Sequence, residues 1–286
     1  MAWPYVRHRF RRLLTDFQID IIISVHPILT TIAARLVMEC GVPMVVVVSD
    51  PVSVHALWFP PGAALYLVGT EKARQSALRY AIPLERVQVT GMPTRLGFDA
   101  PCVDKLEARK HLRWAPELPT VLLMNGGDGI GPIFKIARAI ASSGLYCQLV
   151  VVTGRNARLC EKMRAVLWEI PTHVYSFVVE LDMIMKAADV LVSKAGASTV
   201  WEALNVGVPI LFSNYLSGHE DGNVDYVVAG GAGRQTPGPE AVVNALRELF
   251  EEPSRETLRR MAENARRIAH PDAARNIART VLAAAS

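Results

Sequence analysis

The sequence predicts an α/β protein with two Rossmann-like, doubly wound domains. Short apolar runs rich in β-branched residues alternate with helical segments along the whole chain. These runs lack strict polar–apolar alternation, which is typical of strands buried on both faces of a parallel sheet. A polar stretch rich in Gly and Pro, residues 91–114, divides the pattern into two series and therefore into two domains.

The first series predicts four strands and two helices between them. The predicted strands are 19–25, 43–50, 64–70 and 87–91, and the predicted helices are 30–40 and 71–81. Gly41, followed by Pro43, ends the first of these helices. A further helix precedes the first strand, whereas a doubly wound domain normally opens with a strand whose loop carries ligand-binding residues. We therefore expect that opening unit to be missing from this series.

The second series predicts five strands, each followed by a helix except the last. The strands are 119–125, 147–154, 172–178, 189–193 and 208–214, and the helices are 133–143, 157–170, 181–188 and 198–207. An amphipathic helix, about 271–286, ends the chain. We place the domains at 1–98 and 99–286, and the last helix is a candidate for packing back on the first domain.

The charge is uneven along the 286 residues. The net charge is +4, and residues 1–98 account for it with 10 Lys/Arg against 6 Asp/Glu. Basic residues near the start alternate with Trp3, Tyr5 and Phe10, so this segment is either a solvated helix or a contact with anionic lipid. Nothing extends a basic stripe further, so we expect no nucleic-acid partner.

The cysteines and the apolar runs indicate the cellular compartment of the protein. The four cysteines show no metal-ligand spacing, which indicates reduced thiols and no metal site. No apolar run reaches the ~18 residues of a spanning helix, and charges interrupt any signal peptide at the start. The sequence thus predicts a cytoplasmic protein that lies peripherally on the inner face of the membrane.

The stretch SKAGASTVWEALNVGVP, residues 193–209, carries the strongest local signal for a ligand. Lys194, Gly196, Ser198 and Thr199 follow a buried strand, and we expect the next helix to begin near Ser198 or Thr199 with one of them as its cap. The amides and dipole at a helix start favour an anion such as phosphate. Glu202, one turn further on, could accept hydrogen bonds from sugar or ribose hydroxyls. The alternative is an ordinary capped helix with a solvated Glu202.

Three more polar loops follow strands of the second series. Because the carboxyl ends of parallel strands share one edge of the sheet, these loops predict a binding crevice there. Phe177, at the end of one of these strands, either belongs to the core or covers a nucleobase. The residues singled out in the loops are Gly126, Gly127 and Gly129, then Gly154 and Asn156, and then His219, Glu220 and Asn223.

Two residues of the first series are catalytic candidates. His26 follows a strand and could act as a base, since its pKa lies near neutrality. Asp50 also ends a strand and could orient a His or an acceptor hydroxyl, or else cap the segment before Pro51. The pair Trp58-Phe59 is either core or a contact with lipid.

Several motifs together resemble a known family. GGDGIGP, VTGRN, SKAGASTVWEAL and SGHEDGNVDYVV are similar to the nucleotide-sugar-binding domain of the diacylglycerol glycosyltransferases, which include the monogalactosyldiacylglycerol synthases. SVHP, VVSDPVSVHALWF and TGMPTR are similar to the rest of that family's N-terminal domain. The family is related to the enzyme that adds N-acetylglucosamine to lipid-linked cell-wall precursor. The resemblance covers nearly the whole chain.

The resemblance implies a GT-B fold and an inverting transfer of a hexose from a UDP-sugar to diacylglycerol. No cofactor or metal is implied besides the UDP-hexose donor, and the anionic membrane surface would be a further partner. Three alternatives stay open: another lipid-linked acceptor, a UDP-sugar 2-epimerase, and a donor-binding homologue without activity. The last arises because the relatives' first strand and their Gly-rich loop ending in His are absent from this sequence.

The resemblance also assigns roles by position. Gly126, Gly127, Gly129, Gly154 and Asn156 would lie near the donor, and Phe177 and Val178 would hold the uracil. Ala195, Gly196, Ser198 and Thr199 would bind the pyrophosphate with Arg95, where Lys194 could add a charge. Glu202 would bind the ribose, and His219, Glu220 and Asn223 would face the sugar. Two positions depart from the pattern. His219 stands where many relatives have Gln, and Asn125 stands where a third Gly is common.

Overall fold

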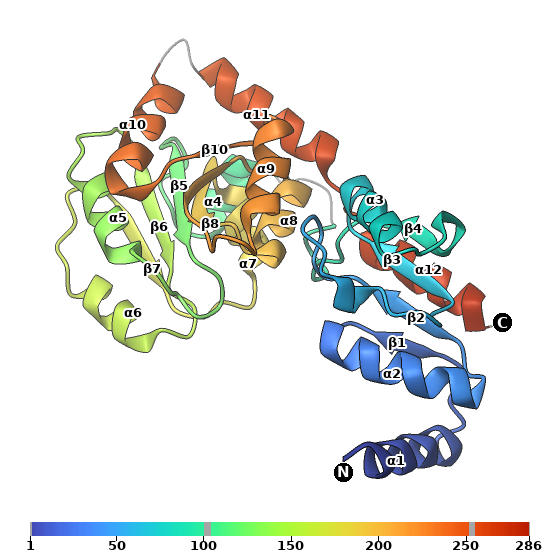
Figure 1. Cartoon of the computed structure of the whole chain (residues 1–286). Coiled ribbons are helices and arrows are strands. Elements are labelled where there is room, and N and C mark those ends of the chain that lie inside the picture. The colour runs from blue at the N-terminus through green and yellow to red at the C-terminus, as the bar shows by residue number, and fades with distance from the viewer. Residues whose placement is uncertain (1, 100–103, 252–254, 286) are drawn as a thin grey trace. The chain divides into compact units, whose positions relative to one another are not determined.

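The computed structural model describes residues 2–99, 104–251 and 255–285 and divides the chain into two compact units. Unit 1 is Met1–Pro93 with His270–Ser286, and unit 2 is Thr94–Ala269 (Figure 1). The division after Pro93 falls five residues before the expected boundary, so the segment with Arg95 belongs to unit 2. The last helix is part of unit 1. Cys102 lies outside the described residues.

Unit 1 is built on a four-stranded parallel sheet with the order β1-β2-β3-β4. Each strand pairs with the next one along the chain. The strands are β1 (Ile22–Ser24), β2 (Met44–Val47), β3 (Leu65–Val68) and β4 (Val87–Val89), and the helical elements are α1 (Ala2–Asp16), α2 (Pro27–Cys40), η1 (Ala56–Trp58), α3 (Glu71–Arg79), η2 (Leu84–Arg86) and α12 (Ala273–Ala285).

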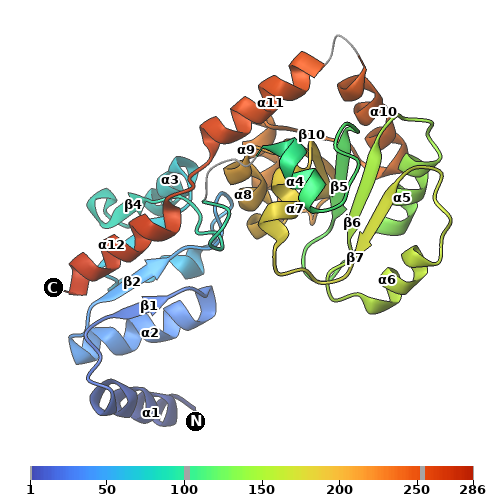
Figure 2. The same ribbon diagram turned by 180° about the vertical axis from the view of Figure 1, so that it is seen from behind.

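The two faces of this sheet are covered by different parts of the chain. Val46 of β2 packs with residues of α2, η1 and α3 in one buried cluster. Val45 and Val47 point the other way, because successive side chains of a strand alternate, and pack with Val281 of α12. Figures 1 and 2 show α12 beside the sheet. The returning helix therefore completes the core of unit 1.

The basic residues of α1 are partly neutralised within unit 1. Arg7 and Arg11 both contact the carboxylate of Glu39 on α2, at 2.6 and 3.0 Å. Arg35 lies over the ring of Trp3, with its guanidinium carbon 4.1 Å from the ring centre. Tyr5 stays exposed. The charge available to an external partner is therefore smaller than the sequence count suggests.

Unit 2 contains a six-stranded parallel sheet with the order β10-β9-β8-β5-β6-β7. The predicted α/β class is thus confirmed, although β10, α4, α9, α10 and α11 were not predicted from the sequence. The strands are β5 (Thr120–Met124), β6 (Gln148–Val152), β7 (Thr172–Tyr175), β8 (Val190–Lys194), β9 (Ile210–Asn214) and β10 (Gly233–Gln235), and the helices are α4 (Lys105–His111), α5 (Ile133–Ala141), α6 (Ala157–Arg164), α7 (Leu181–Ala187), α8 (Ala197–Val206), α9 (Asp221–Ala229), α10 (Gly238–Phe250) and α11 (Arg255–Ile268).

The strand order creates a switch point in the middle of this sheet. The chain moves outward from β5 to β6 and β7, then returns to place β8 on the other side of β5. With right-handed crossovers, α5 and α7 must cover opposite faces, and Figure 1 shows them so. The loops after β5 and β8 therefore leave in opposite directions, and the crevice between them is where ligands bind in open α/β sheets.

No helix among the described residues combines the length and apolarity that a membrane span needs.

Candidate functional site

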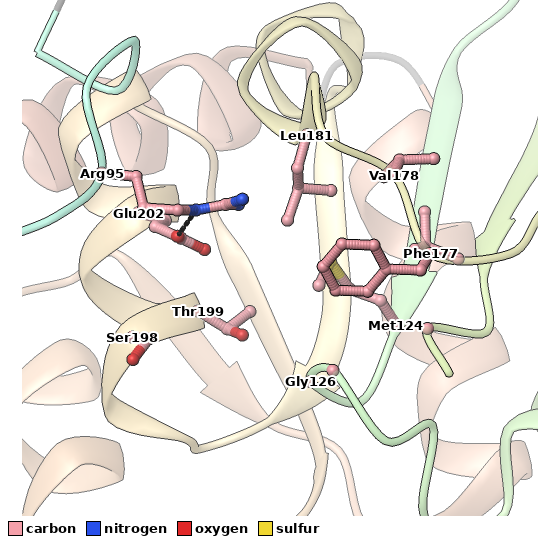
Figure 3. Close-up of a pocket in the computed structure, with 12 residues that line it drawn as sticks. Arg95, Met124, Gly126, Phe177, Val178, Leu181, Ser198, Thr199 and Glu202 are labelled. Atoms are coloured by element: carbon pink, nitrogen blue, oxygen red, sulfur yellow. Dashed lines mark hydrogen bonds and ion pairs between the residues drawn. The ribbon is translucent and has the colours of Figure 1, made fainter. Parts of the chain in front are cut away.

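A cavity of about 190 Å³ lies in unit 2 at the carboxyl ends of the central strands. Figure 3 shows an apolar side and a polar side, with glycine backbone between them. The cavity occupies the switch point, because its walls come from the loops after β5, β6 and β7 and from the start of α8. Its lining residues are Arg95, Met124, Gly126, Gly127, Val152, Gly154, Phe177, Val178, Leu181, Ser198, Thr199 and Glu202.

The polar side includes the first turn of α8. The helix begins at Ala197 with Gly196 as its N-cap, and no side chain caps it. The expectation that Ser198 or Thr199 caps this helix is wrong, because both lie inside its first turn. Both residues instead line the cavity, at the positive end of the helix dipole. This arrangement suits an anionic group.

Glu202 lies one turn further along α8, and its burial excludes the interpretation as a solvated residue. It is 6% exposed, and its Oε1 accepts a hydrogen bond from Arg95 Nε at 3.2 Å. Burial raises the pKa of the Glu202 carboxyl above its usual value, while Arg95 acts in the opposite direction. Unlike Glu202, the Arg95 side chain is half exposed. A buried carboxylate at the wall of a cavity is available to hydroxyl donors of a ligand.

The segment that carries Arg95 is fixed to unit 2 by two helices. Asn205 of α8 donates to the hydroxyl of Thr94 at 3.1 Å. Lys186 of α7, which is buried, donates to the carbonyl oxygen of Gly97 at 2.7 Å. Arg95 lies between these two anchor points and is therefore held at the cavity by its own backbone.

Glycine allows two loops of the site to touch through their backbones. Arg155 N donates to the Gly127 carbonyl at 2.7 Å. A Cβ at Gly154 would overlap that carbonyl, and a Cβ at Gly129 would overlap the carbonyl of Thr153. Both glycines also have positive φ, of 60° and 57°. Gly126, Gly127 and Gly154 line the cavity, whereas Gly129 supports the loop contact behind it.

Asn156 has a structural role in the same contact. Its side chain caps α6 by accepting from Leu159 N at 3.0 Å and also donates to the Gly129 carbonyl at 3.3 Å. It does not line the cavity.

The apolar side of the cavity presents side chains to a flat group. Phe177 is 54% exposed, so the alternative that it belongs to the core is wrong. It lines the cavity with Val178, Met124 and Leu181. The sequence analysis missed Met124, Val152 and Leu181. The signal for the first two was available, because each is the last residue of a strand that ends at this edge.

The residues of the loop after β9 lie outside the cavity wall. Glu220 is buried and accepts from Lys194 Nζ at 3.0 Å and from Leu216 N at 3.0 Å. Asn223, also buried, donates to the carbonyl of Ala195 at 2.9 Å. His219 is exposed. The structure thus groups Glu220, Asn223 and Lys194 beside the turn that precedes α8.

The two catalytic candidates lie in unit 1. His26 is exposed and occupies the N-cap position of α2 without a side-chain capping bond. Asp50 accepts from the indole nitrogen of Trp58 at 2.6 Å and does not cap a helix. Trp58 and Phe59 are buried in the core of unit 1, so the alternative that this pair contacts lipid is wrong.

Within the described ranges, no group of three or more His, Cys, Asp or Glu side chains has the arrangement of a metal site.

Two family models match separate parts of the chain. Residues 133–277 match the glycosyltransferase family 28 C-terminal domain. Residues 1–94 match the monogalactosyldiacylglycerol (MGDG) synthase model.

Curated relatives agree with these models. A probable chloroplastic monogalactosyldiacylglycerol synthase of Nicotiana tabacum is 35% identical over 281 residues, which cover 94% of this chain and 52% of that protein. The chloroplastic monogalactosyldiacylglycerol synthase 1 of Arabidopsis thaliana is 34% identical over 282 residues, with the same two shares. The chain thus spans about half the length of the curated relatives it matches.

Solved structures share the fold at low identity. MurG of Acinetobacter baumannii is 16% identical with a TM-score of 0.66, over 95% of this chain and 75% of that one. The UDP complex of MnaA from S. aureus is 17% identical with a TM-score of 0.68, over 97% and 79%. A UDP-GlcNAc 2-epimerase from Neisseria meningitidis, bound to UDP-GlcNAc, is 16% identical with a TM-score of 0.67, over 98% and 81%. These likenesses show the GT-B type of fold. By its sequence matches, the chain belongs to glycosyltransferase family 28, and its first third matches the monogalactosyldiacylglycerol synthase model.

Proposed function

We propose that this chain transfers a hexose from a UDP-sugar to the hydroxyl group of diacylglycerol, with inversion at the sugar carbon. The observation that carries the proposal is the composition of the cavity in unit 2. It combines an apolar wall, glycine backbone, a helix start and a buried carboxylate in one space. A nucleoside diphosphate presents a flat base, a ribose diol and a diphosphate, which these features complement in turn.

Each part of the donor has a proposed binding partner in unit 2. The uracil would lie against Phe177 and Val178. The ribose hydroxyls would donate to Glu202, and the diphosphate would face the first turn of α8. The sugar would then extend toward Glu220 and Asn223, which are grouped with Lys194 beside that turn.

The chemistry follows from this placement. Departure of UDP leaves negative charge on the diphosphate, which the amides at the start of α8 and the guanidinium of Arg95 would stabilise. A base must take the proton of the acceptor hydroxyl as it attacks the sugar carbon. His26 and Asp50 are the proposed candidates for the acceptor side, with His26 as the base.

The names of the relatives support the acceptor, since those proteins are called monogalactosyldiacylglycerol synthases. Two of the structures with the same fold are complexes with UDP or a UDP-sugar. We further propose that the protein lies on an anionic membrane surface, where its lipid substrate resides.

Two measurements on the 286-residue chain test the proposal. Calorimetry should show that UDP binds more tightly than uridine, because only UDP reaches the start of α8. Release of UDP from UDP-galactose or UDP-glucose should then require diacylglycerol. Failure of UDP to bind would refute the donor site.

The remaining outcomes separate the alternatives. Conversion of a UDP-sugar to its 2-epimer without acceptor would identify an epimerase. Tight binding of UDP without any transfer would identify a donor-binding protein. Transfer to a different lipid would keep the donor site and overturn diacylglycerol as the acceptor.

A further inference from the structure

Asn125 connects two loops of the donor site although it does not line the cavity. It follows β5 directly and is 1% exposed. Its Oδ1 accepts from the backbone nitrogen of Lys194 at 3.0 Å, and its Nδ2 donates to the carbonyl of Ile130 at 2.9 Å. Only this orientation of the amide satisfies both backbone groups. One side chain thus joins the glycine loop, residues 125–131, to the turn before α8.

This bond lies where the ladder between β5 and β8 ends. The last paired residues of these two strands are Leu123 and Val192. Beyond them, the side chain of Asn125 accepts from the backbone nitrogen of Lys194 and continues the contact between the two chain segments. A buried amide without a partner costs ~1–3 kcal/mol, and Asn125 supplies a partner for Lys194.

The nitrogen end of the Asn125 side-chain amide explains why residue 131 is a glycine. Gly131 has φ of 113°, and a Cβ there would lie 2.7 Å from Asn125 Nδ2. The loop therefore passes closely over the Asn125 amide, and its Ile130 carbonyl is held in place. The glycine loop and the turn before α8 are consequently fixed at one spacing.

We propose that Asn125 is a positioning residue that sets the distance between the glycine loop and the start of α8, and thereby the affinity for the diphosphate of the donor. This inference rests on the proposed function. The hydrogen bonds of Asn125 do not involve the residues proposed to bind the base or the ribose. Its substitution should therefore affect the binding of the diphosphate. Loss of Asn125 should weaken UDP binding and leave uridine binding nearly unchanged.

Gln148 provides a matched control in the same sheet. It is also fully buried, accepts from Ala115 N at 3.0 Å and donates to the Ala115 carbonyl at 2.7 Å. It starts β6, however, and so lies at the opposite edge of the sheet from the cavity. Asn125→Ala and Gln148→Ala each remove a buried amide that bridges backbone groups, but only the first borders the donor site.

The test compares these two variants and Asn125→Asp with the wild-type 286-residue chain. Calorimetry would measure the affinity for UDP and uridine, and urea unfolding would measure stability. We expect Asn125→Ala to raise the Kd of UDP at least about tenfold, which corresponds to ~1.4 kcal/mol, and that of uridine less than threefold. Asn125→Asp retains the bond to Lys194 N but loses the donor to Ile130, and its negative charge also opposes the diphosphate. It should therefore also bind UDP more weakly than the wild type.

Gln148→Ala should lose stability and keep both affinities. Equal loss of UDP and uridine in Asn125→Ala, an unchanged affinity for UDP, or a similar selective loss in Gln148→Ala would each overturn the proposal.

Hydrogen exchange of the unliganded proteins separates this inference from the proposed function. The Lys194 amide should be protected in the wild type and exchange faster in Asn125→Ala, whether or not UDP is the ligand. If the wild type binds no UDP, the proposed function fails together with the part of this inference that concerns the diphosphate. The exchange result then still tests whether Asn125 fixes the spacing of the two loops. Unchanged exchange at Lys194 would show that Asn125 does not hold the turn.

Discussion

Substitution of Glu202 by Gln should stabilise the protein and weaken its proposed ligand binding. The carboxyl group is buried, and its pKa is raised by that burial. A carboxyl whose pKa is higher in the folded state stabilises the fold when protonated, and this contribution is lost as the pH rises through the raised pKa. Ionisation of Glu202 therefore lowers the free energy of unfolding.

The expected gain in stability is modest. Glutamine keeps an oxygen that can accept from Arg95 Nε, and the guanidinium is half exposed, so water can solvate it. We expect Glu202→Gln to raise the free energy of unfolding by up to about 1 kcal/mol at pH 7, the scale of a partly exposed ion pair. The gain should shrink as the pH falls and vanish below about pH 4.5, the ordinary pKa of the group, because Glu202 is then protonated in both states.

The expected loss in binding is larger. A hydrogen bond to a charged group contributes ~1.5–3 kcal/mol. If the ribose diol donates to the carboxylate, Glu202→Gln should raise the Kd of UDP roughly 10- to 150-fold. The penalty should be smaller for 2′-deoxy-UDP, which lacks one of the two donors.

Urea unfolding between pH 4 and 8 and calorimetry with both nucleotides measure these effects. Glu161→Gln, the same chemical change on the exposed surface of α6, is the control. A Glu202→Gln protein that binds UDP as tightly as the wild type, or that is clearly less stable at pH 7, would refute the reasoning.

Three further predictions concern the loops, the border of unit 2 and the membrane. Gly154→Ala should cost about 1–3 kcal/mol more stability than Gly144→Ala, since both have positive φ but only Gly154 faces another backbone; equal urea midpoints would argue against the loop contact. In calorimetry, fragment 94–269 should bind UDP at least about tenfold more tightly than fragment 99–265, which lacks Arg95 and the Gly97 carbonyl that pairs with Lys186; similar affinities would exclude a role for the 94–98 segment. The full chain should sediment with anionic vesicles and lose this binding as salt rises, and equal binding to neutral vesicles would contradict an electrostatic contact.

The sequence predicted the α/β class and the edge of the sheet that carries the cavity, because both follow from local patterns. Runs such as 121–124 are apolar throughout, and parallel strands bring their following loops to one edge. The strand β10 was missed because it has three residues and no distinct apolar pattern.

Long-range contacts explain what the sequence could not predict. The start of α8 depends on the turn that Asn125 fixes from 69 residues away. Glu202 is buried on α8, and helices α7 and α11 pack against α8, which no local pattern shows. The local sequence around Trp58 and Phe59 was compatible with both a core and a surface position. In the structure, η1 packs against α2, and both residues belong to the core.

The return of α12 to unit 1 has a consequence for synthesis of the chain. Unit 2 is one continuous stretch, whereas the core of unit 1 joins Val45 and Val47 to Val281. A ribosome that adds roughly 5–20 residues per second needs roughly 10–40 s between the end of β4 and Val281. During that interval one face of the β1–β4 sheet lacks its cover, while unit 2 can already fold. The order of folding should therefore be the reverse of the order of the strands, with the second sheet complete before the first.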